Sequence, residues 1–178
     1  MKKSNPIDDR LKFALDVNPD TLIVDDCGCE VDLAVSSPKN TECPKSGAVS
    51  KLVPITAVMT AVKLDRQSDI RETDLYYFCN DSDCPVIYFS NGNVPVFEKS
   101  DLVVKVFSKD SGMDVNVCYC YDWSRGRIIE QIDQTGRTTA YDEISTALSV
   151  GICECEFKNP KGVCCLGDVQ RFIAEHSL

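Results

Sequence analysis

Short apolar runs separated by polar tips occupy the middle of the chain, and this pattern predicts β-strands joined by tight turns. The clearest case is the segment 74–97, in which aromatic and β-branched runs flank a polar tip that carries Cys79 and Cys84. Asn91 and Gly92 then give a turn signal before a third apolar run. The segment therefore predicts a hairpin followed by a third strand.

Apolar residues recur at helical spacing toward the C-terminus. The residues that repeat every three or four positions are Ile144, Ala147, Leu148, Val169, Phe172 and Ile173. We expect helices over about 122–134, over 138–151 and from Leu166 onward. Asp122 or Ser124 is the candidate N-cap of the first of these helices.

Three other segments carry shorter signals. Residues 21–35 predict two short strands around a C-x-C tip, and residues 101–107, DLVVKVF, predict one more strand. Between them, Pro54 and Thr56 mark the start of a short helix that we expect to run through Lys63, with Thr56 as its N-cap.

Together these patterns predict an α+β chain that is divided into units. Strand-like patterning changes to helix-like patterning near Gly112. We therefore expect an N-terminal extension over residues 1–41, a small β unit with one helix over 42–110, and a helical unit over 113–178.

The composition limits the partners of the chain. Its 178 residues are 43% hydrophobic, enough for one ordinary core or for two small metal-tied units. A net charge of −9 argues against nucleic acid or an anionic membrane as the main partner. We expect a cytoplasmic protein, because no signal peptide is visible and no apolar run approaches the roughly twenty residues of a membrane span.

Cysteine is the residue type that points to chemistry. The chain has eleven cysteines and one histidine, and six of the cysteines lie between Cys118 and Cys165 as C-x-C, C-x-C and C-C. Clustered thiolates suit a soft metal ion or an iron–sulfur cluster, because several sulfurs must converge on one centre. No nucleophile–base pair is readable, so reduction of a metal ion by electron transfer is the one enzymatic activity left open.

Two cysteine pairs precede this group. Cys79 and Cys84 lie at the neck of the predicted hairpin turn, where thiols can form a rubredoxin-like knuckle with two sulfurs pointing the same way; the alternative is two buried hairpin cysteines. The pair Cys27 and Cys29 allows three interpretations: a surface metal site, half of a zinc site, or incidental thiols beside a glycine turn.

Three motifs resemble one known family. They are YYFCNDSDCPVIYF, VCYCYDW and CEFKNPKGVCCLGDV. They resemble the N-terminal domain of the archaeal copper chaperone CopZ, and the second unit is similar to the helical iron–sulfur fold of bacterioferritin-associated ferredoxin. The resemblance implies a zinc ion and a [2Fe–2S] cluster. It places the cluster ligands at Cys118, Cys120, Cys155 and Cys165, and leaves Cys153 and Cys164 in reserve.

The same resemblance implies zinc ligands at Cys43, Cys79 and Cys84. Where the family has C-P-x-C-G, this chain has a serine, Ser46, in place of the second cysteine, so one expected thiolate is missing. The candidates for the fourth ligand are an acidic side chain, a water molecule, Cys27 and Cys29. No segment matches the family's C-x-x-C copper loop, so we do not expect copper delivery by this polypeptide alone.

The expected fold is thus a small zinc-knuckle β unit followed by a helical [2Fe–2S]-binding unit. Three functions follow from it. The first is a one-electron redox accessory in the trafficking of a soft ion, copper or mercury, for a metal carrier protein or a metal-transporting ATPase. The second is a ferredoxin-like electron donor or regulator for a redox partner, without metal cargo. The third is a structural adaptor that holds zinc only.

Overall fold

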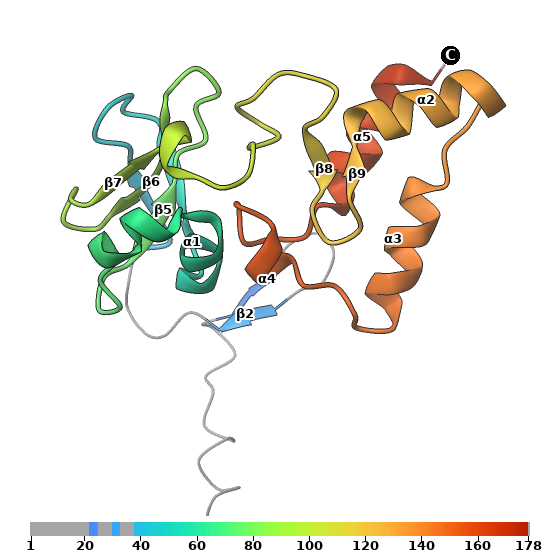
Figure 1. Ribbon diagram of the computed structural model, residues 1–178. Helices are drawn as coiled ribbons and strands as arrows, with labels where there is room; N and C mark the ends of the chain where they lie inside the picture. The colour runs from blue at the N-terminus through green and yellow to red at the C-terminus, as the bar shows by residue number, and fades with distance from the viewer. Residues whose placement is uncertain (1–21, 25–29, 33–37, 178) are drawn as a thin grey trace, which may run out of the picture.

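A computed structural model of the chain describes residues 22–24, 30–32 and 38–177. Its largest sheet has five strands, and each strand pairs antiparallel with the next in the sequence. The strands are β3 (Asn40–Glu42), β4 (Val49–Val53), β5 (Tyr76–Phe78), β6 (Val86–Ser90) and β7 (Val96–Glu98). Figure 1 shows this sheet at one side of the molecule and most of the helices at the other.

The predicted hairpin and third strand are confirmed by β5, β6 and β7. Phe78 pairs with Tyr88 across the hairpin, and the Cys79 amide donates to the Ile87 carbonyl at 3.0 Å. All five residues of β6 are buried, because both faces of the sheet are covered at this strand. One face packs under a helix, and the other carries the stacked rings of Tyr77 and Phe89.

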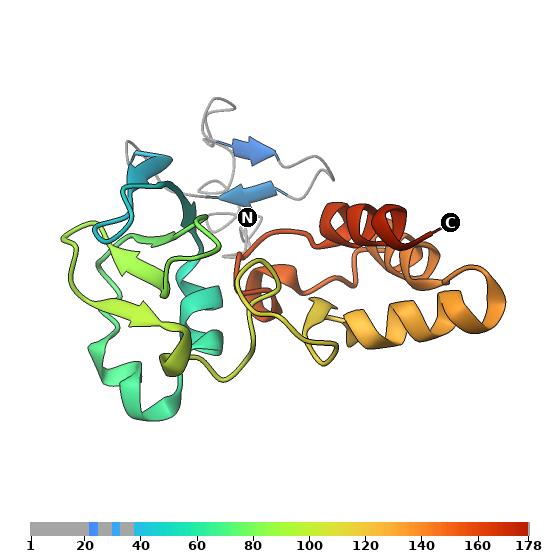
Figure 2. The same cartoon turned by 90° about the horizontal axis from the view of Figure 1, so that it is seen from above.

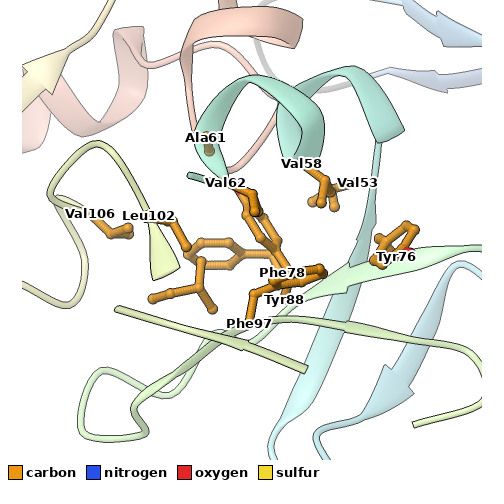
Figure 3. Packing of buried hydrophobic residues seen from close by; sticks show 11 residues of the cluster. Val53, Val58, Ala61, Val62, Tyr76, Phe78, Tyr88, Phe97, Leu102 and Val106 are labelled. Carbon is orange, nitrogen blue, oxygen red and sulfur yellow. The ribbon is translucent and has the colours of Figure 1, made fainter. Parts of the chain in front are cut away.

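The covering helix is α1 (Ile55–Ala61), and Figure 3 shows Val58 of this helix and Val62, directly after it, on the side that faces the aromatic rings of the sheet. The expected boundaries were wrong: the helix begins directly after Pro54 and ends two residues before Lys63. Thr56 is not its N-cap, because the Thr56 hydroxyl donates to the carbonyl of Glu156 at 3.1 Å. Two 3₁₀-helices, η3 (Leu64–Asp69) and η4 (Lys99–Asp101), complete this part of the chain.

The strand expected over residues 101–107 does not form. One isolated bridge, between Val62 and Leu102, is the β-pairing of this segment. Side chains satisfy its backbone instead: the Val106 amide donates to Asp110 at 2.6 Å, and the Phe107 amide donates to the Tyr119 hydroxyl at 2.8 Å. Alternating valines therefore misled the prediction, because local side-chain partners replaced a sheet ladder.

The C-terminal part forms helices where the periodicity places them. It contains the strand pair β8 (Asn116–Cys118) and β9 (Trp123–Ser124), then α2 (Arg125–Thr135), α3 (Ala140–Ser149), the short α4 (Cys155–Lys158) and α5 (Leu166–His176). Ser124 is the N-cap of α2, and its hydroxyl accepts a hydrogen bond from the Arg127 amide. Helix α4 was not expected, because four residues are too few to show a period.

A second core lies between these helices. Its largest buried side chains are Trp123, Ile128, Ile144, Val169 and Phe172, and three cysteines, Cys118, Cys155 and Cys165, are buried among them. The strand-rich and helix-rich parts thus each have a core of their own.

The two parts meet where α4 lies beside α1, as both Figure 1 and Figure 2 show. Side chains cross this boundary at several points: the Tyr88 hydroxyl donates to the Pro160 carbonyl at 2.6 Å, Thr56 donates to the Glu156 carbonyl at 3.1 Å, and Thr60 donates to the Phe157 carbonyl. The division into independent units therefore stays a prediction, although the change from strands to helices falls where the sequence indicates.

The two short strands expected near the N-terminus are present as β1 (Leu22–Val24) and β2 (Glu30–Asp32), which pair antiparallel. Cys27 and Cys29 fall outside the residues that the structure describes. Within the described part of the chain, no helix has the length and apolar character to cross a membrane.

Candidate metal centres

Three cysteines from separate positions of the sheet converge on one point. The Sγ atoms of Cys43, Cys79 and Cys84 all lie within 4.8 Å of one another, and those of Cys43 and Cys84 are 4.0 Å apart. Sulfurs around one zinc ion, at bonds of about 2.3 Å, lie roughly 3.8 Å apart. The three thiols are buried and fit a single zinc ion, and we call them the tri-cysteine site.

Backbone turns position the three thiols of this site. Cys43 follows β3 in a loop closed by hydrogen bonds from the Gly47 amide to the Cys43 carbonyl (2.8 Å) and from the Cys43 amide to Ala48. Gly47 has φ of +70°, a left-handed conformation that suits glycine. Cys79 and Cys84 flank the tip between β5 and β6, as the hairpin pattern predicted.

Polar groups at the tri-cysteine site favour the thiolate of Cys43. Burial opposes ionisation of Cys43, but hydrogen bonds from the backbone and hydroxyl of Ser46 and from the Lys45 backbone lower its pKa to about 7. Burial raises the pKa of Cys79. The buried Lys109 ammonium donates to the carbonyls of Asp81 (2.6 Å) and Cys84 (3.1 Å), so a positive charge adjoins the knuckle. The sequence gave no local sign of this role for Lys109.

Ser46 lies at the fourth position of the tri-cysteine site. Its Oγ is 3.6 Å from the Cys79 Sγ and accepts a hydrogen bond from the Ala48 amide at 3.3 Å. A serine at the place of the missing thiolate was visible in the sequence, but its contact with Cys79, 33 residues away, was not. The other candidates, Cys27 and Cys29, fall outside the described residues.

A second set of thiols lies in the helix-rich part. The four cysteines form a closed ring in which each hydrogen-bonds to two others: Cys118 with Cys120 and Cys165, and Cys155 with the same two. The Sγ atoms of Cys120 and Cys155 are 3.6 Å apart. We call this set the thiol ring; it contains the four residues to which the resemblance assigned the cluster.

Three different elements bring the ring together. Cys118 ends β8, Cys155 begins α4, and Cys165 is the N-cap of α5. The 159–163 loop between the last two is held by the buried Asn159, whose side chain donates to the Val163 carbonyl at 2.6 Å. Gly162 in this loop approaches Pro54, where a Cβ on Gly162 would collide. The loop glycine is thus required by packing against α1, a reason that the sequence does not reveal.

Hydrogen bonds within the ring shift the pKa values of its members in opposite directions. Hydrogen bonds from Cys118 and Cys155 lower the pKa of Cys120 to about 3 and the pKa of Cys165 to about 5. The same bonds raise the pKa values of Cys118 and Cys155, with burial adding to the effect.

The two reserve cysteines flank the ring. Cys164 hydrogen-bonds to Cys155, and Cys153 hydrogen-bonds to Tyr121. Both are half-buried, whereas three of the four ring members are fully buried.

The ring is wider than a site for one ion. Among the residues that the structure describes, the tri-cysteine site is the one group whose ligand atoms all lie within 4.8 Å of one another. Four thiolates of the ring match the donor set of a [2Fe–2S] cluster, which spreads its ligands over two irons. The chemistry of the donors therefore fits the group that the resemblance implies.

Comparison with known proteins agrees with the first of these sites. Residues 40–103 match the family model zf_CopZ, a zinc binding domain, and this span includes the whole tri-cysteine site. The chain carries a CopZ-type zinc-binding domain. The copper chaperone CopZ of Archaeoglobus fulgidus is 30% identical over 96 residues, which are 54% of this chain and 45% of that protein. The match thus spans less than half of the chaperone.

A solved structure extends the likeness beyond the zinc-binding domain. The crystal structure of the Archaeoglobus fulgidus CopZ N-terminal domain superposes with a TM-score of 0.61 at 29% identity, and the match covers 74% of this chain and 96% of that domain. The antiparallel sheet and the mixed α and β architecture are therefore those of a CopZ N-terminal domain.

Proposed function

We propose that this protein is a redox accessory in the trafficking of a soft metal ion. In this proposal the tri-cysteine site holds zinc, and the thiol ring holds a [2Fe–2S] cluster through Cys118, Cys120, Cys155 and Cys165. The observation that carries the proposal is the difference between the sites: one has the spacing of a single ion, and the other is a wider ring of four thiols.

A [2Fe–2S] cluster supplies one-electron chemistry when bound. One electron from an external protein donor, passed to one Cu(II), leaves one Cu(I), the form that soft thiolate carriers prefer. The residues of this chain bury the ring in the second core, and they orient it through β8, α4 and α5. The relative that carries the name copper chaperone makes a metal carrier protein or a metal-transporting ATPase the expected partner.

A cargo-free electron donor is the second candidate. The net charge of −9 favours it, because an acidic surface steers encounters with basic redox partners. The two functions differ in their reaction with Cu(II). A trafficking accessory reduces Cu(II) and releases the product, Cu(I). A dedicated electron donor passes its electron to its protein partner and not to Cu(II).

The test begins with anaerobic purification and elemental analysis. We expect about two irons and one zinc per chain, visible absorption that bleaches with dithionite, and a reduced-state EPR signal. The reduced protein is then mixed with Cu(II) and a Cu(I)-specific chromogenic chelator. One Cu(I) per cluster supports the redox accessory; a colourless protein with zinc in both sites would leave only the structural adaptor.

A further inference from the structure

Among the residues that the structure describes, the tri-cysteine site has three thiols and no fourth thiolate or carboxylate grouped with them. Cys43, Cys79 and Cys84 are 2%, 0% and 5% exposed. Ser46, which occupies the fourth corner, is a solvent-exposed residue. The three sulfurs are thus shielded, whereas the residue beside them at the expected fourth position is exposed to solvent.

The hydroxyl at this corner is a weak competitor for a soft ion. Ser46 Oγ already accepts a hydrogen bond from the Ala48 amide and lies 3.6 Å from the Cys79 Sγ, to which it can donate. A neutral hydroxyl keeps its proton at neutral pH, whereas thiophilic ions select thiolate donors. An incoming thiolate therefore gains a metal bond without displacing a charged ligand.

The surroundings accept negative charge at this corner. A divalent ion with three thiolates carries one net negative charge, and a fourth thiolate adds a second. Lys45, next to Ser46, carries an exposed ammonium that pairs with Glu98 at 2.9 Å, and the buried Lys109 donates to the Cys84 carbonyl at 3.1 Å. The Lys109 cation offsets part of the added charge, whereas Lys45 is already paired with Glu98.

We propose that the tri-cysteine site takes an external cysteine thiolate as its fourth ligand, at the corner occupied by Ser46. This inference rests on the proposed zinc site and makes it an exchangeable centre, unlike a closed structural zinc site. The thiolate can belong to a free thiol or to a cysteine of a partner protein, and in both cases the ion becomes bridged between this chain and the incoming sulfur.

The experiment counts sulfur ligands at zinc by X-ray absorption at the zinc edge, which ignores iron. It uses the full-length protein alone, with excess reduced glutathione, and with a ten-residue peptide containing one cysteine. We expect three sulfurs and one oxygen in the protein alone and four sulfurs after thiol addition. A response to glutathione alone assigns the corner to free thiols, and a response to both ligands extends it to protein thiols.

Two variants sharpen the result. S46C should show four sulfurs with or without added thiol and should lose zinc more slowly to a chelator. S46A should still change from three sulfurs to four when thiol is added, because the incoming thiolate does not need the Ser46 hydroxyl. If S46C does not fold, S46A and the thiol additions still decide the question.

Three sulfurs that no thiol changes would overturn the proposal. Four sulfurs before any addition would also overturn it, and a C27S/C29S double variant would then show whether the extra thiolate is internal. A chain that binds no zinc contradicts the zinc site itself. Iron content is measured on the same samples, so loss of the cluster function is distinguished from failure of the open corner.

Discussion

The hydroxyl of Tyr88 donates to the carbonyl of Pro160 at 2.6 Å, and both groups are buried. Tyr88 lies on β6, in the middle of the sheet, and Pro160 lies in the loop between two cysteines of the thiol ring. Burial raises the pKa of Tyr88, so this phenol stays a neutral donor. One hydrogen bond thus ties the sheet to the loop that positions Cys155 and Cys165.

Removing the Tyr88 hydroxyl tests whether its hydrogen bond to Pro160 stabilises the loop between Cys155 and Cys165. Y88F leaves the Pro160 carbonyl unpaired, which should lower the free energy of unfolding by roughly 1–3 kcal/mol and, for a chain of this size, lower Tm by about 2–4 °C per kcal/mol. We also expect faster loss of iron to a chelator. Y77F is the control, because the Tyr77 hydroxyl donates to Pro38 on the other face of the sheet. Equal rates of iron loss in both variants would show that the Tyr88–Pro160 hydrogen bond does not hold this loop.

Serine substitutions separate the ring from its flanking thiols. C155S and C165S should abolish or strongly alter the visible iron–sulfur spectrum, because each removes a sulfur from the closed ring. C153S and C164S are the matched controls and should leave it nearly intact. Absorption and EPR spectra of anaerobically purified variants provide the measurement. Bleaching by C164S but not by C165S would move the ligand assignment by one residue.

A substitution of Lys109 tests the zinc knuckle without changing any of its metal ligands. K109M keeps an apolar stem of similar length but removes the hydrogen bonds to the Asp81 and Cys84 carbonyls. Outer-shell losses of this kind typically lower metal affinity about 10–100-fold, and we expect that range in competition with a zinc chelator. K105M is the control, because Lys105 is an exposed residue paired with Asp114. Unchanged zinc affinity in K109M would show that the knuckle holds its shape alone.

Alanine substitutions at Gly162 and Gly151 separate the stability cost of close packing from the stability cost of backbone conformation. Both have left-handed φ, +67° and +72°, but a Cβ on Gly162 would meet Pro54 whereas a Cβ on Gly151 meets nothing within 4 Å. Each alanine variant should lose about 1–2 kcal/mol from φ alone. G162A should lose roughly 1–3 kcal/mol more through overpacking against α1. Chemical denaturation measures both variants; equal losses would mean that the loop retreats from α1.

Local sequence determined most of the secondary structure. The hairpin of β5 and β6 and the helices α2, α3 and α5 follow from periodicity and turn residues within a few positions, and these signals act before any tertiary contact forms. The capping role of Ser124 followed for the same reason. Residues 101–107 show the limit: their alternation matches a strand, yet Asp110 and Tyr119 satisfy their amides from outside the segment.

The sequence by itself also showed which cysteines could ligate metal, because ligand type and spacing are local properties. The family resemblance grouped these cysteines, but only the tertiary structure shows which sulfurs come close: Cys43 meets Cys84 across 41 residues, and Cys120 meets Cys155 across 35. It alone brought the Lys109 ammonium to the zinc knuckle and the Ser46 hydroxyl to its exposed corner. Such convergence depends on how strands and helices pack over long separations, and no local pattern of side chains encodes that packing.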